Sequence, residues 1–156
     1  CENDKDLKVR PGYPHGVERM ESCLLSYGSD MNEYDTPFEC GLDTYLNLDA
    51  TVDSLSLPAL RELQGKQTKK LMGILFDEGV DVSEFFNLEG GYDVIVDGQL
   101  VGEIRSQAWS FRYQKYMMFA MLDIDYITQY DSITVAGIQG KIHPLSLFKA
   151  ALEALA

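Results

Sequence analysis

The chain has 156 residues, 46% of them hydrophobic, which is enough for a folded domain with an apolar core. Its formal net charge of −12 argues against general nucleic-acid binding and against an anionic membrane surface, because both partners require clustered Lys and Arg side chains. No stretch approaches the roughly 20 apolar residues of a membrane span, and no signal-peptide pattern is present. A small anionic ligand stays compatible with this charge, since it needs only a local basic patch.

The first residue, Cys1, leaves two readings open: a mature lipoprotein with an acylated N-terminal Cys, or a fragment of a longer chain, which we favour. The polar residues 1–9 predict an extended lead-in, and R-P-G-Y-P at 10–14 predicts a turn.

The next stretch, Gly16 to Leu42, predicts a helix followed by an acidic turn. Val17, Met20 and Leu24 recur at three- and four-residue intervals, so we expect them to share one helix face. Gly28 is placed to end that helix, because glycine adopts the left-handed conformation without a Cβ penalty.

Residues 43–53 are consistent with a strand or a loop, and L-P-A-L-R-E-L-Q-G at 57–65 has the punctuation of a short helix. Pro58 lies in its first turn and Gly65 at its end. A face of Leu57, Leu60 and Leu63 is expected to meet the core.

Several short strands follow this helix. Residues 71–76 form a buried apolar run, and residues 94–101 predict a hairpin with Asp97-Gly98 as the turn pair. Residues 103–108 alternate as in a strand exposed on one side. Residues 116–122 and 132–135 predict two more strands, and residues 77–91 an acidic loop. A series of short strands with turn signals indicates a small antiparallel barrel or a jelly-roll-like sandwich.

The fold class is therefore α+β. We expect three parts: a piece of an α+β core over residues 1–65, an antiparallel β-barrel over 66–148, and an Ala/Leu-rich helical tail over 149–156. In the tail, Phe148, Leu152 and Leu155 would lie along one side of the helix.

Four sequence blocks carry a recognisable pattern: R-M-E at Arg19–Glu21, Y-G-S-D at Tyr27–Asp30, T-P-F-E-C-G-L at Thr36–Leu42 and G-E-I-R-S-Q-A-W-S-F at Gly102–Phe111. Together they resemble the glycine cleavage T-protein superfamily of tetrahydrofolate-dependent one-carbon enzymes, and the fourth block is similar to that family's G-x-V-T-S-x-x-x-S-P. The resemblance covers only the C-terminal portion of relatives more than twice as long. It implies that this portion is a barrel packed beside a folate-binding core.

Tetrahydrofolate, the cofactor that the resemblance implies, has a flat pterin, an aryl ring and a glutamate tail that carries carboxylates. Aromatic side chains suit the rings, and Arg, Lys or His suits the tail. The candidate cofactor-binding residues are His15, Arg19, Tyr27, Arg105 and Trp109, with Arg112, Tyr113 and Lys115 as further cationic or aromatic side chains.

Each candidate also has a structural alternative. Arg19 and Glu21 could anchor their helix to neighbours, Tyr27 could be a core residue, and Trp109 could pack into the barrel. Glu39 is expected to accept hydrogen bonds within its turn.

The resemblance also bears on the reaction. Glycine-cleavage members have an Arg where this chain has His15, and imidazole cannot form the bidentate fork that Arg gives a carboxylate. The surrounding residues resemble dimethylsulfoniopropionate demethylases of the same superfamily, so the expected partner is a small-molecule methyl donor, with an aminomethyl donor as the alternative. A non-catalytic folate-binding protein is a third reading. The family's catalytic aspartate would lie upstream, so we assign no catalytic residue here and expect this chain alone to be inactive.

The three cysteines form no dense framework, and an odd number fits a reducing, cytoplasmic location. Cys23 and Cys40 are interpreted as small buried side chains, not nucleophiles. His15 and His143 are the only histidines, and no Cys/His spacing indicates a metal site. Without its upstream partner, the apolar face of the first helix should be buried against the barrel, the C-terminal helix or a second copy of the chain.

Overall fold

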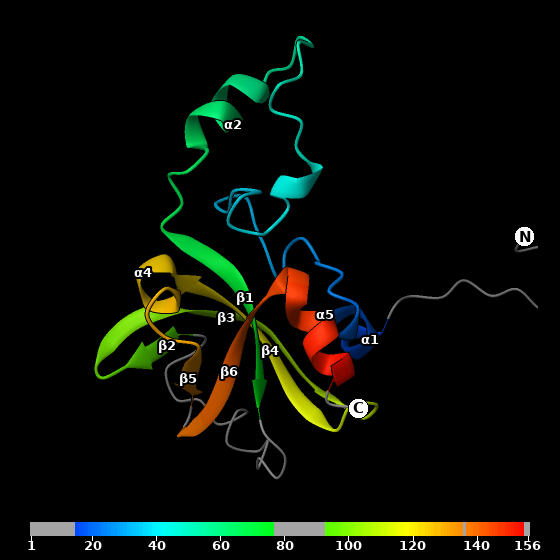
Figure 1. Ribbon diagram of the computed structural model, residues 1–156, viewed down its shortest axis with the longest axis vertical. Coiled ribbons are helices and arrows are strands. Elements are labelled where there is room, and N and C mark those ends of the chain that lie inside the picture. The colour runs from blue at the N-terminus through cyan, green and yellow to red at the C-terminus, as the bar shows by residue number, and fades with distance from the viewer. Residues whose placement is uncertain (1–14, 77–92, 136, 155–156) are drawn as a thin grey trace, which may run out of the picture.

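The computed structural model describes residues 15–76, 93–135 and 137–154 (Figure 1). The lead-in and turn expected over 1–14, the loop expected over 77–91 and the two Cys1 readings lie outside the described residues. None of the described helices is long and apolar enough to cross a membrane.

A six-stranded antiparallel sheet forms the body of the molecule, in the order β2-β3-β4-β1-β6-β5. The bounds of its strands are Lys69–Phe76 (β1), Asp93–Val96 (β2), Gln99–Ser110 (β3), Lys115–Asp123 (β4), Ser132–Val135 (β5) and Ile138–Pro144 (β6). The two edge strands, β2 and β5, approach each other, so the sheet is nearly closed. The predicted antiparallel barrel is confirmed.

Two apolar clusters lie on opposite faces of this sheet. Because side chains alternate along a strand, Met72, Ile74 and Phe76 of β1 point into the barrel, whereas Leu71 and Leu75 point outward. Strand β4 behaves in the same way, and all its residues from Lys115 to Leu122 are buried.

Two helices cover the outer cluster, α1 (Gly16–Glu21) and α5 (Leu145–Ala154). Figure 1 shows them side by side against one wall of the barrel. Met20 of α1 and Phe148 of α5 are almost fully buried there. The expected burial of the α1 face against the barrel and the C-terminal helix is therefore confirmed for Val17 and Met20, which belong to this cluster.

Helix α1 is shorter than predicted. It ends at Glu21, since Cys23 adopts a left-handed conformation (φ 54°) and Leu24 N–H bonds the carbonyl of Arg19. This is a Schellman motif that uses Cys in place of Gly. Leu24 consequently leaves the helix face and is 56% exposed, and Gly28 lies in a later turn instead of ending the helix.

Residues 43–66, which we name the arm, project away from the barrel (Figure 1). The arm contains a 3₁₀ turn, η1 (Asp43–Tyr45), and helix α2 (Leu57–Leu63). The strand alternative for residues 43–53 is therefore wrong. Pro58 and Gly65 lie at the two ends of α2 as predicted, but Leu63 is exposed, so only part of the expected apolar face is covered.

The remaining elements confirm one predicted turn, add two elements that were not predicted and move the start of the C-terminal helix. The Asp97-Gly98 turn has positive φ at both residues, as a type I′ hairpin requires. Helix α4 (Ile124–Ile127) and strand β6 were not predicted, and the C-terminal helix begins at Leu145, four residues earlier than expected. The division at residue 65 stays a prediction.

Candidate functional site

Helix α1 has His15 as its N-cap, and the extended backbone of this residue (φ −63°, ψ 145°) precedes the first turn. Its Nδ1 atom accepts a hydrogen bond from Val17 N–H at 3.4 Å, and the Glu18 carboxylate accepts one from His15 N–H at 3.4 Å. This reciprocal pair is a capping box, which satisfies otherwise free backbone donors. The imidazole therefore has a structural role at this position.

Arg19 is held by a buried carboxylate. Its guanidinium pairs with Asp30, whose side chain is fully buried, and also donates to the Leu24 carbonyl and the Ser106 hydroxyl, both at 3.2 Å. Asp30 in turn accepts hydrogen bonds from Ser26 N–H at 2.6 Å and from the Ser106 hydroxyl. This network joins α1, the turn after it and strand β3, so Arg19 has the anchoring role foreseen as the alternative to ligand contact.

Glu21 makes a second link between the helix and β3. Its carboxylate accepts a hydrogen bond from the Ser110 hydroxyl at 2.6 Å, and Ser110 accepts one from Tyr113 N–H at 3.0 Å. Two blocks whose contacting residues lie 87 and 89 positions apart in the chain are thus joined in space, through Ser106 and Ser110 on β3 and through Arg19 and Glu21 on α1. Many of the residues in the recognised blocks therefore have a structural role: they attach helix α1 to strand β3, and we call this attachment the joint.

The T-P-F-E-C-G-L block forms a compact turn beside β1. Glu39 accepts hydrogen bonds from the Thr36 backbone N–H at 2.7 Å and hydroxyl at 2.8 Å, which confirms its expected structural role. Its carbonyl accepts Leu71 N–H at 2.8 Å and so attaches the turn to the barrel. Cys40 is buried here. Burial, reinforced by the Asp35 and Glu39 charges, raises the pKa of its thiol to about 11, so it is no nucleophile at neutral pH.

A cluster of charges lies next to this turn. The shielded carboxylate of Asp35 accepts a hydrogen bond from Lys69 at 2.8 Å and one from Arg105 at 3.2 Å. Arg105 also lies 3.4 Å from a Glu103 oxygen. Burial alone would raise the pKa of Asp35, but the hydrogen bonds from Lys69 and Asn32 N–H and the two nearby cations outweigh it. The pKa therefore lies below its ordinary value.

Three of the five predicted cofactor-binding residues lie around one hollow of about 380 Å³ on the outer surface of β3: His15, Arg19 and Arg105. Tyr27 lies apart and is 69% exposed, so its interpretation as a core residue is wrong. Trp109 packs against the barrel interior, on the other face of the sheet. The structure thus gathers the basic candidates and separates the aromatic ones from them.

Side chains that the sequence reasoning did not select complete the site: Asp30, Asp35, Lys69 and Ser106. The first and last of these belong to the quoted blocks, so the blocks themselves carried that signal. Asp35 and Lys69 had no such signal, because their pairing joins residues that are 34 positions apart.

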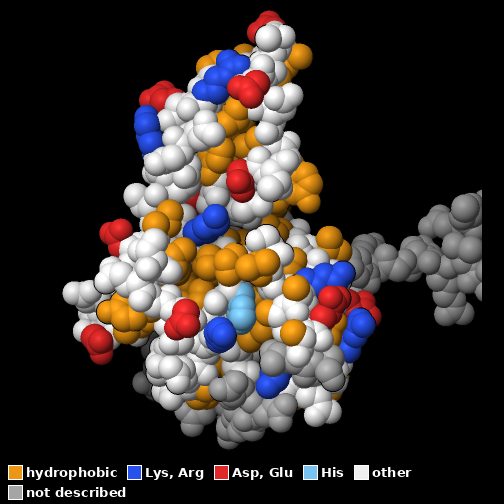
Figure 2. Space-filling view, viewed as in Figure 1, with side chains coloured by type: hydrophobic (Ala, Val, Ile, Leu, Met, Phe, Trp, Pro, Cys, Tyr) orange, Lys and Arg blue, Asp and Glu red, His pale blue; other side chains and the backbone are white. Residues whose placement is uncertain are grey.

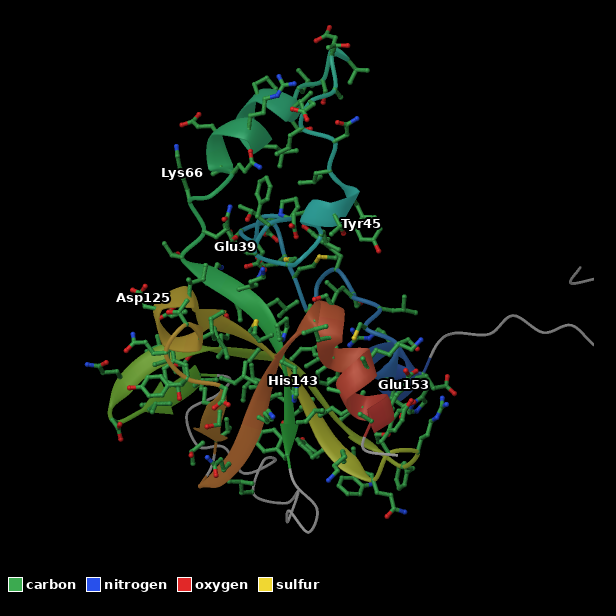
Figure 3. All side chains as sticks on the ribbon, viewed as in Figure 1. Glu39, Tyr45, Lys66, Asp125, His143 and Glu153 are labelled. Carbon is green, nitrogen blue, oxygen red and sulfur yellow. The ribbon has the colours of Figure 1, made fainter. Side chains whose placement is uncertain are left out.

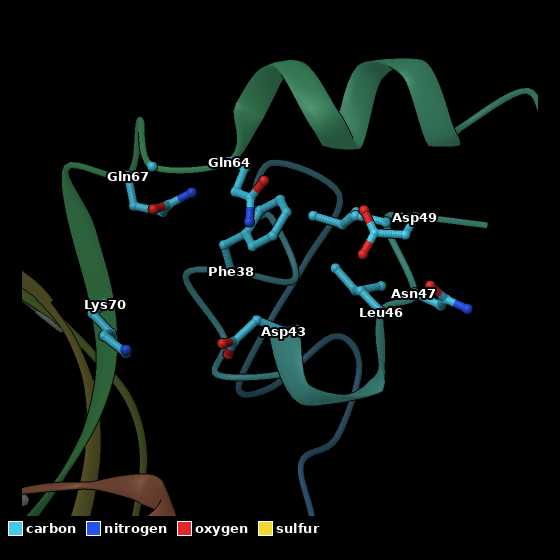
Figure 4. Close-up of a pocket in the computed structure, with 10 residues that line it drawn as sticks. Phe38, Asp43, Leu46, Asn47, Asp49, Gln64, Gln67 and Lys70 are labelled. Atoms are coloured by element: carbon cyan, nitrogen blue, oxygen red, sulfur yellow. The ribbon is translucent and has the colours of Figure 1, made fainter. Parts of the chain in front are cut away.

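A further hollow, of about 420 Å³, opens between the arm and the start of β1 (Figure 4). Its lining includes Phe38, Asp43, Gln64, Gln67 and Lys70. Figure 2 shows hydrophobic side chains at the surface in the same region, between the arm and the barrel. The labelled Glu39 in Figure 3 marks the turn that lies beside this junction.

A near-closed antiparallel barrel with a helix and a polar turn locked onto one outer face defines the class of domain. Residues 69–152 match the family described as the glycine cleavage T-protein C-terminal barrel domain. Since this match spans more than half of the chain, the chain belongs to that family.

Curated relatives agree with this assignment. The dimethylsulfoniopropionate demethylase DmdA of Ruegeria pomeroyi is 33% identical over 118 residues, which are 76% of this chain and 31% of that protein. An aminomethyltransferase of Prochlorococcus marinus is 32% identical over 84% of this chain and 34% of its own length. The mitochondrial dimethylglycine dehydrogenase of Rattus norvegicus is 27% identical over 90% of this chain and 16% of its own length. The chain thus spans about a third or less of these proteins.

A solved structure supports the fold. The glycine cleavage system aminomethyltransferase T from Bartonella henselae superposes with a TM-score of 0.64, covering 86% of this chain and 38% of that one. At 13% sequence identity this similarity concerns the fold alone.

Proposed function

We propose that the full-length protein is a tetrahydrofolate-dependent one-carbon transferase whose donor is a methylated sulfonium compound such as dimethylsulfoniopropionate. The observation that carries the choice of donor is the 33% identity to a dimethylsulfoniopropionate demethylase over three quarters of this chain. The imidazole at position 15 supports it, because it takes the place of the Arg expected in glycine-cleavage members. A sulfonium is already an activated methyl donor, so the protein has mainly to align the donor with the acceptor.

The basic hollow fits a folate in one respect. Its lining includes His15, Arg19 and Arg105, and cationic side chains of this kind suit the carboxylates of a folate tail. Tetrahydrofolate would supply the methyl-accepting nitrogen.

This chain's own residues would form one wall of the site. Asp30 holds Arg19, and the α1 cap uses only Nδ1 of His15, which leaves Nε2 uncommitted among the described residues. The upstream part of the protein is proposed to supply the opposite wall and the catalytic carboxylate.

The test is an assay of the full-length protein with tetrahydrofolate and dimethylsulfoniopropionate, in which 5-methyltetrahydrofolate is measured. We expect product with this donor and none with an aminomethylated lipoyl carrier protein. The reverse result would establish aminomethyl transfer, the second candidate, which the 32% identity to an aminomethyltransferase favours.

A third outcome separates binding from catalysis. A folate-binding protein without transferase activity would bind tetrahydrofolate and form no product with either donor. The isolated 156-residue chain is expected to bind tetrahydrofolate weakly or not at all, because it contributes only one wall. Micromolar binding by this chain would contradict that expectation.

A further inference from the structure

The arm, residues 43–66, buries too little to stabilise its own conformation. Leu57 is its one buried residue, and a hollow of about 420 Å³ lies between the arm and the start of β1 (Figure 4). Ordering a segment of this length costs conformational entropy at every residue, and burial of one leucine offsets only a small part of that cost. The arm therefore lacks a partner surface among the described residues.

Helix α2 turns its polar contact inward and apolar side chains outward. The guanidinium of Arg61 donates to the backbone carbonyls of residues 48 and 50 at 2.8 and 2.7 Å, so this side of the helix faces the preceding segment. Ala59 and Leu63 lie two residues before and after Arg61, and therefore on the opposite side, since successive residues are about 100° apart. Both are exposed, as are Val52 and Leu55 in the segment that leads into the helix. We call these four side chains the apolar surface of the arm.

The charges of this region indicate what kind of partner it suits. From residue 43 to residue 70, four acidic side chains balance four basic ones, whereas the whole chain has a net charge of −12. They are Asp43, Asp49, Asp53 and Glu62, and Arg61, Lys66, Lys69 and Lys70. A neutral, apolar surface binds by removing apolar area from water and not by attracting an opposite charge. A second copy of the chain suits this surface poorly, because two bodies of charge −12 repel each other.

The position of the arm in the chain indicates a partner within the same protein. The match to the barrel domain begins at residue 69, so the arm precedes that domain. This chain spans 31% of the similar demethylase and 34% of the similar aminomethyltransferase, so those proteins have a large part outside the matched segment. A partner that is joined covalently to the arm acts at a high effective concentration, and it needs little affinity and no electrostatic steering.

We propose that the apolar surface of the arm is the docking surface for the part of the full-length protein that lies upstream of this chain. Val52, Leu55 and Leu63 enter an apolar area of that part. The inference rests on the proposed function only for the existence of an upstream part. The surface is separate from the basic hollow on β3, whose lining includes no residue of the arm.

The experiment compares amide hydrogen exchange in the full-length protein and in the 156-residue chain under the same conditions. The Leu60 and Gln64 N–H groups bond the carbonyls of Ser56 and Leu60 at 2.9 and 3.1 Å, so their exchange reports the opening of α2. In the isolated chain α2 has few buried contacts and should open readily. We expect these amides to exchange at least about tenfold more slowly in the full-length protein, where docking must be broken before α2 opens.

Substitutions locate the contact. Leu55→Asp and Leu63→Asp in the full-length protein should return the exchange of α2 towards the rate of the isolated chain, because an unpaired carboxylate is costly to bury. In the isolated chain the same substitutions should change this rate by less than about twofold, since both positions already face solvent. The matched control is Ile95→Asp on β2, which is 59% exposed and should leave α2 unchanged in both proteins.

Several results would overturn the proposal. One is an α2 that exchanges equally fast in the two unmodified proteins. Another is protection that is already present in the isolated chain: a second copy is the occupant if this protection rises with chain concentration, and a segment of the 156 residues is the occupant if it does not. If the Asp variants of the full-length protein do not fold, Leu63→Ala gives a milder test, and the comparison of the unmodified proteins still decides the question.

The outcome is independent of the assay for methyl transfer. Protection of α2 in a full-length protein that transfers no methyl group would refute the proposed function and leave the docking surface standing. Methyl transfer by a full-length protein whose α2 is unprotected would support the proposed function and refute the docking surface.

Discussion

The barrel and the arm are built on different principles. Strands β1 and β4 are covered on both faces by apolar side chains, so the barrel is stabilised mainly by burial. In the arm, Leu57 is the one residue from 43 to 66 that is buried, and it is still 9% exposed, while Val52 and Leu55 face solvent. Arg61 holds the arm together by donating to the carbonyls of Leu48 and Ala50 at 2.8 and 2.7 Å.

This difference teaches where substitutions should matter. A segment with few buried contacts and exposed hydrogen bonds opens locally at low cost, whereas a core strand opens only with the whole domain. Helix α1 and the polar turns, which attach to the outer face of the barrel, depend on buried charges. The following substitutions test this order of sensitivity, and the barrel is expected to show the largest effects.

Phe148→Ala should have the largest effect. The ring is fully buried, packs edge-on against Phe119 at 5.4 Å and lies directly over Gly73, where no Cβ would fit. The cavity and lost contacts should reduce the free energy of unfolding by roughly 3–5 kcal/mol. Urea unfolding measures this, with Phe111→Ala as the exposed control. A loss below about 1 kcal/mol would place the stability of the barrel elsewhere.

Asp30→Asn should come next. Neutralising this fully buried carboxylate leaves Arg19 without its counter-charge, but Arg19 is slightly exposed, which moderates the cost to about 2–3 kcal/mol. Amide hydrogen exchange should show faster exchange in α1 than in β1 and β4. Uniform acceleration throughout the barrel would mean that the joint and the barrel unfold as one unit.

Acid should weaken the attachment of the turn that contains Asp35 to strands β1 and β3, because this carboxylate accepts hydrogen bonds from Lys69 and Arg105. Its pKa is lowered in the folded state, so its contribution is fully present above the unfolded pKa of about 3.9 and is lost as pH falls through the folded value. Thermal unfolding between pH 5 and pH 2, measured on the unmodified chain and Asp35→Asn, should give curves that converge towards the acid end. Parallel curves would contradict this role.

Leu55→Ser in the arm should have the smallest effect. The side chain is fully exposed, so the free energy of unfolding should change by less than about 0.5 kcal/mol. If this substitution destabilised the chain by more than that, Leu55 would have a contact in solution that the isolated fold does not show, such as a second copy. Sedimentation velocity at two concentrations separates these cases.

The barrel strands could be predicted because local composition and burial agree there. The run at 71–76, the Asp97-Gly98 hairpin and the run at 116–122 are apolar or carry a specific turn pair, and the structure confirms all three. Strand β6 was missed because it contains Gly140 and Pro144, which are weak strand residues. This strand is extended because it pairs with β1, where its partners include Ile74.

The site was harder to predict for physical reasons. Nothing local indicates that Cys23 adopts positive φ, so the helix was drawn too long. The alternation expected over residues 103–108 fails at Arg105, because a bulge depends on the pairing with β4 and not on the strand itself. Tyr27 and Trp109 fit a ligand site by chemistry alone, whereas the fold directs them to solvent and to the barrel interior.

The position of β1 has a consequence for synthesis on the ribosome. Of the six strands of the sheet it is the first to leave the exit tunnel, but it lies in the middle of the sheet, between β4 and β6. Neither neighbour exists until about 40 to 70 further residues have been translated, and α5 covers its outer face later still. Loops of this length make closure slow. The nascent chain therefore carries an apolar, unpaired strand for much of its elongation, which makes it a natural client for holding chaperones and makes refolding yield sensitive to protein concentration.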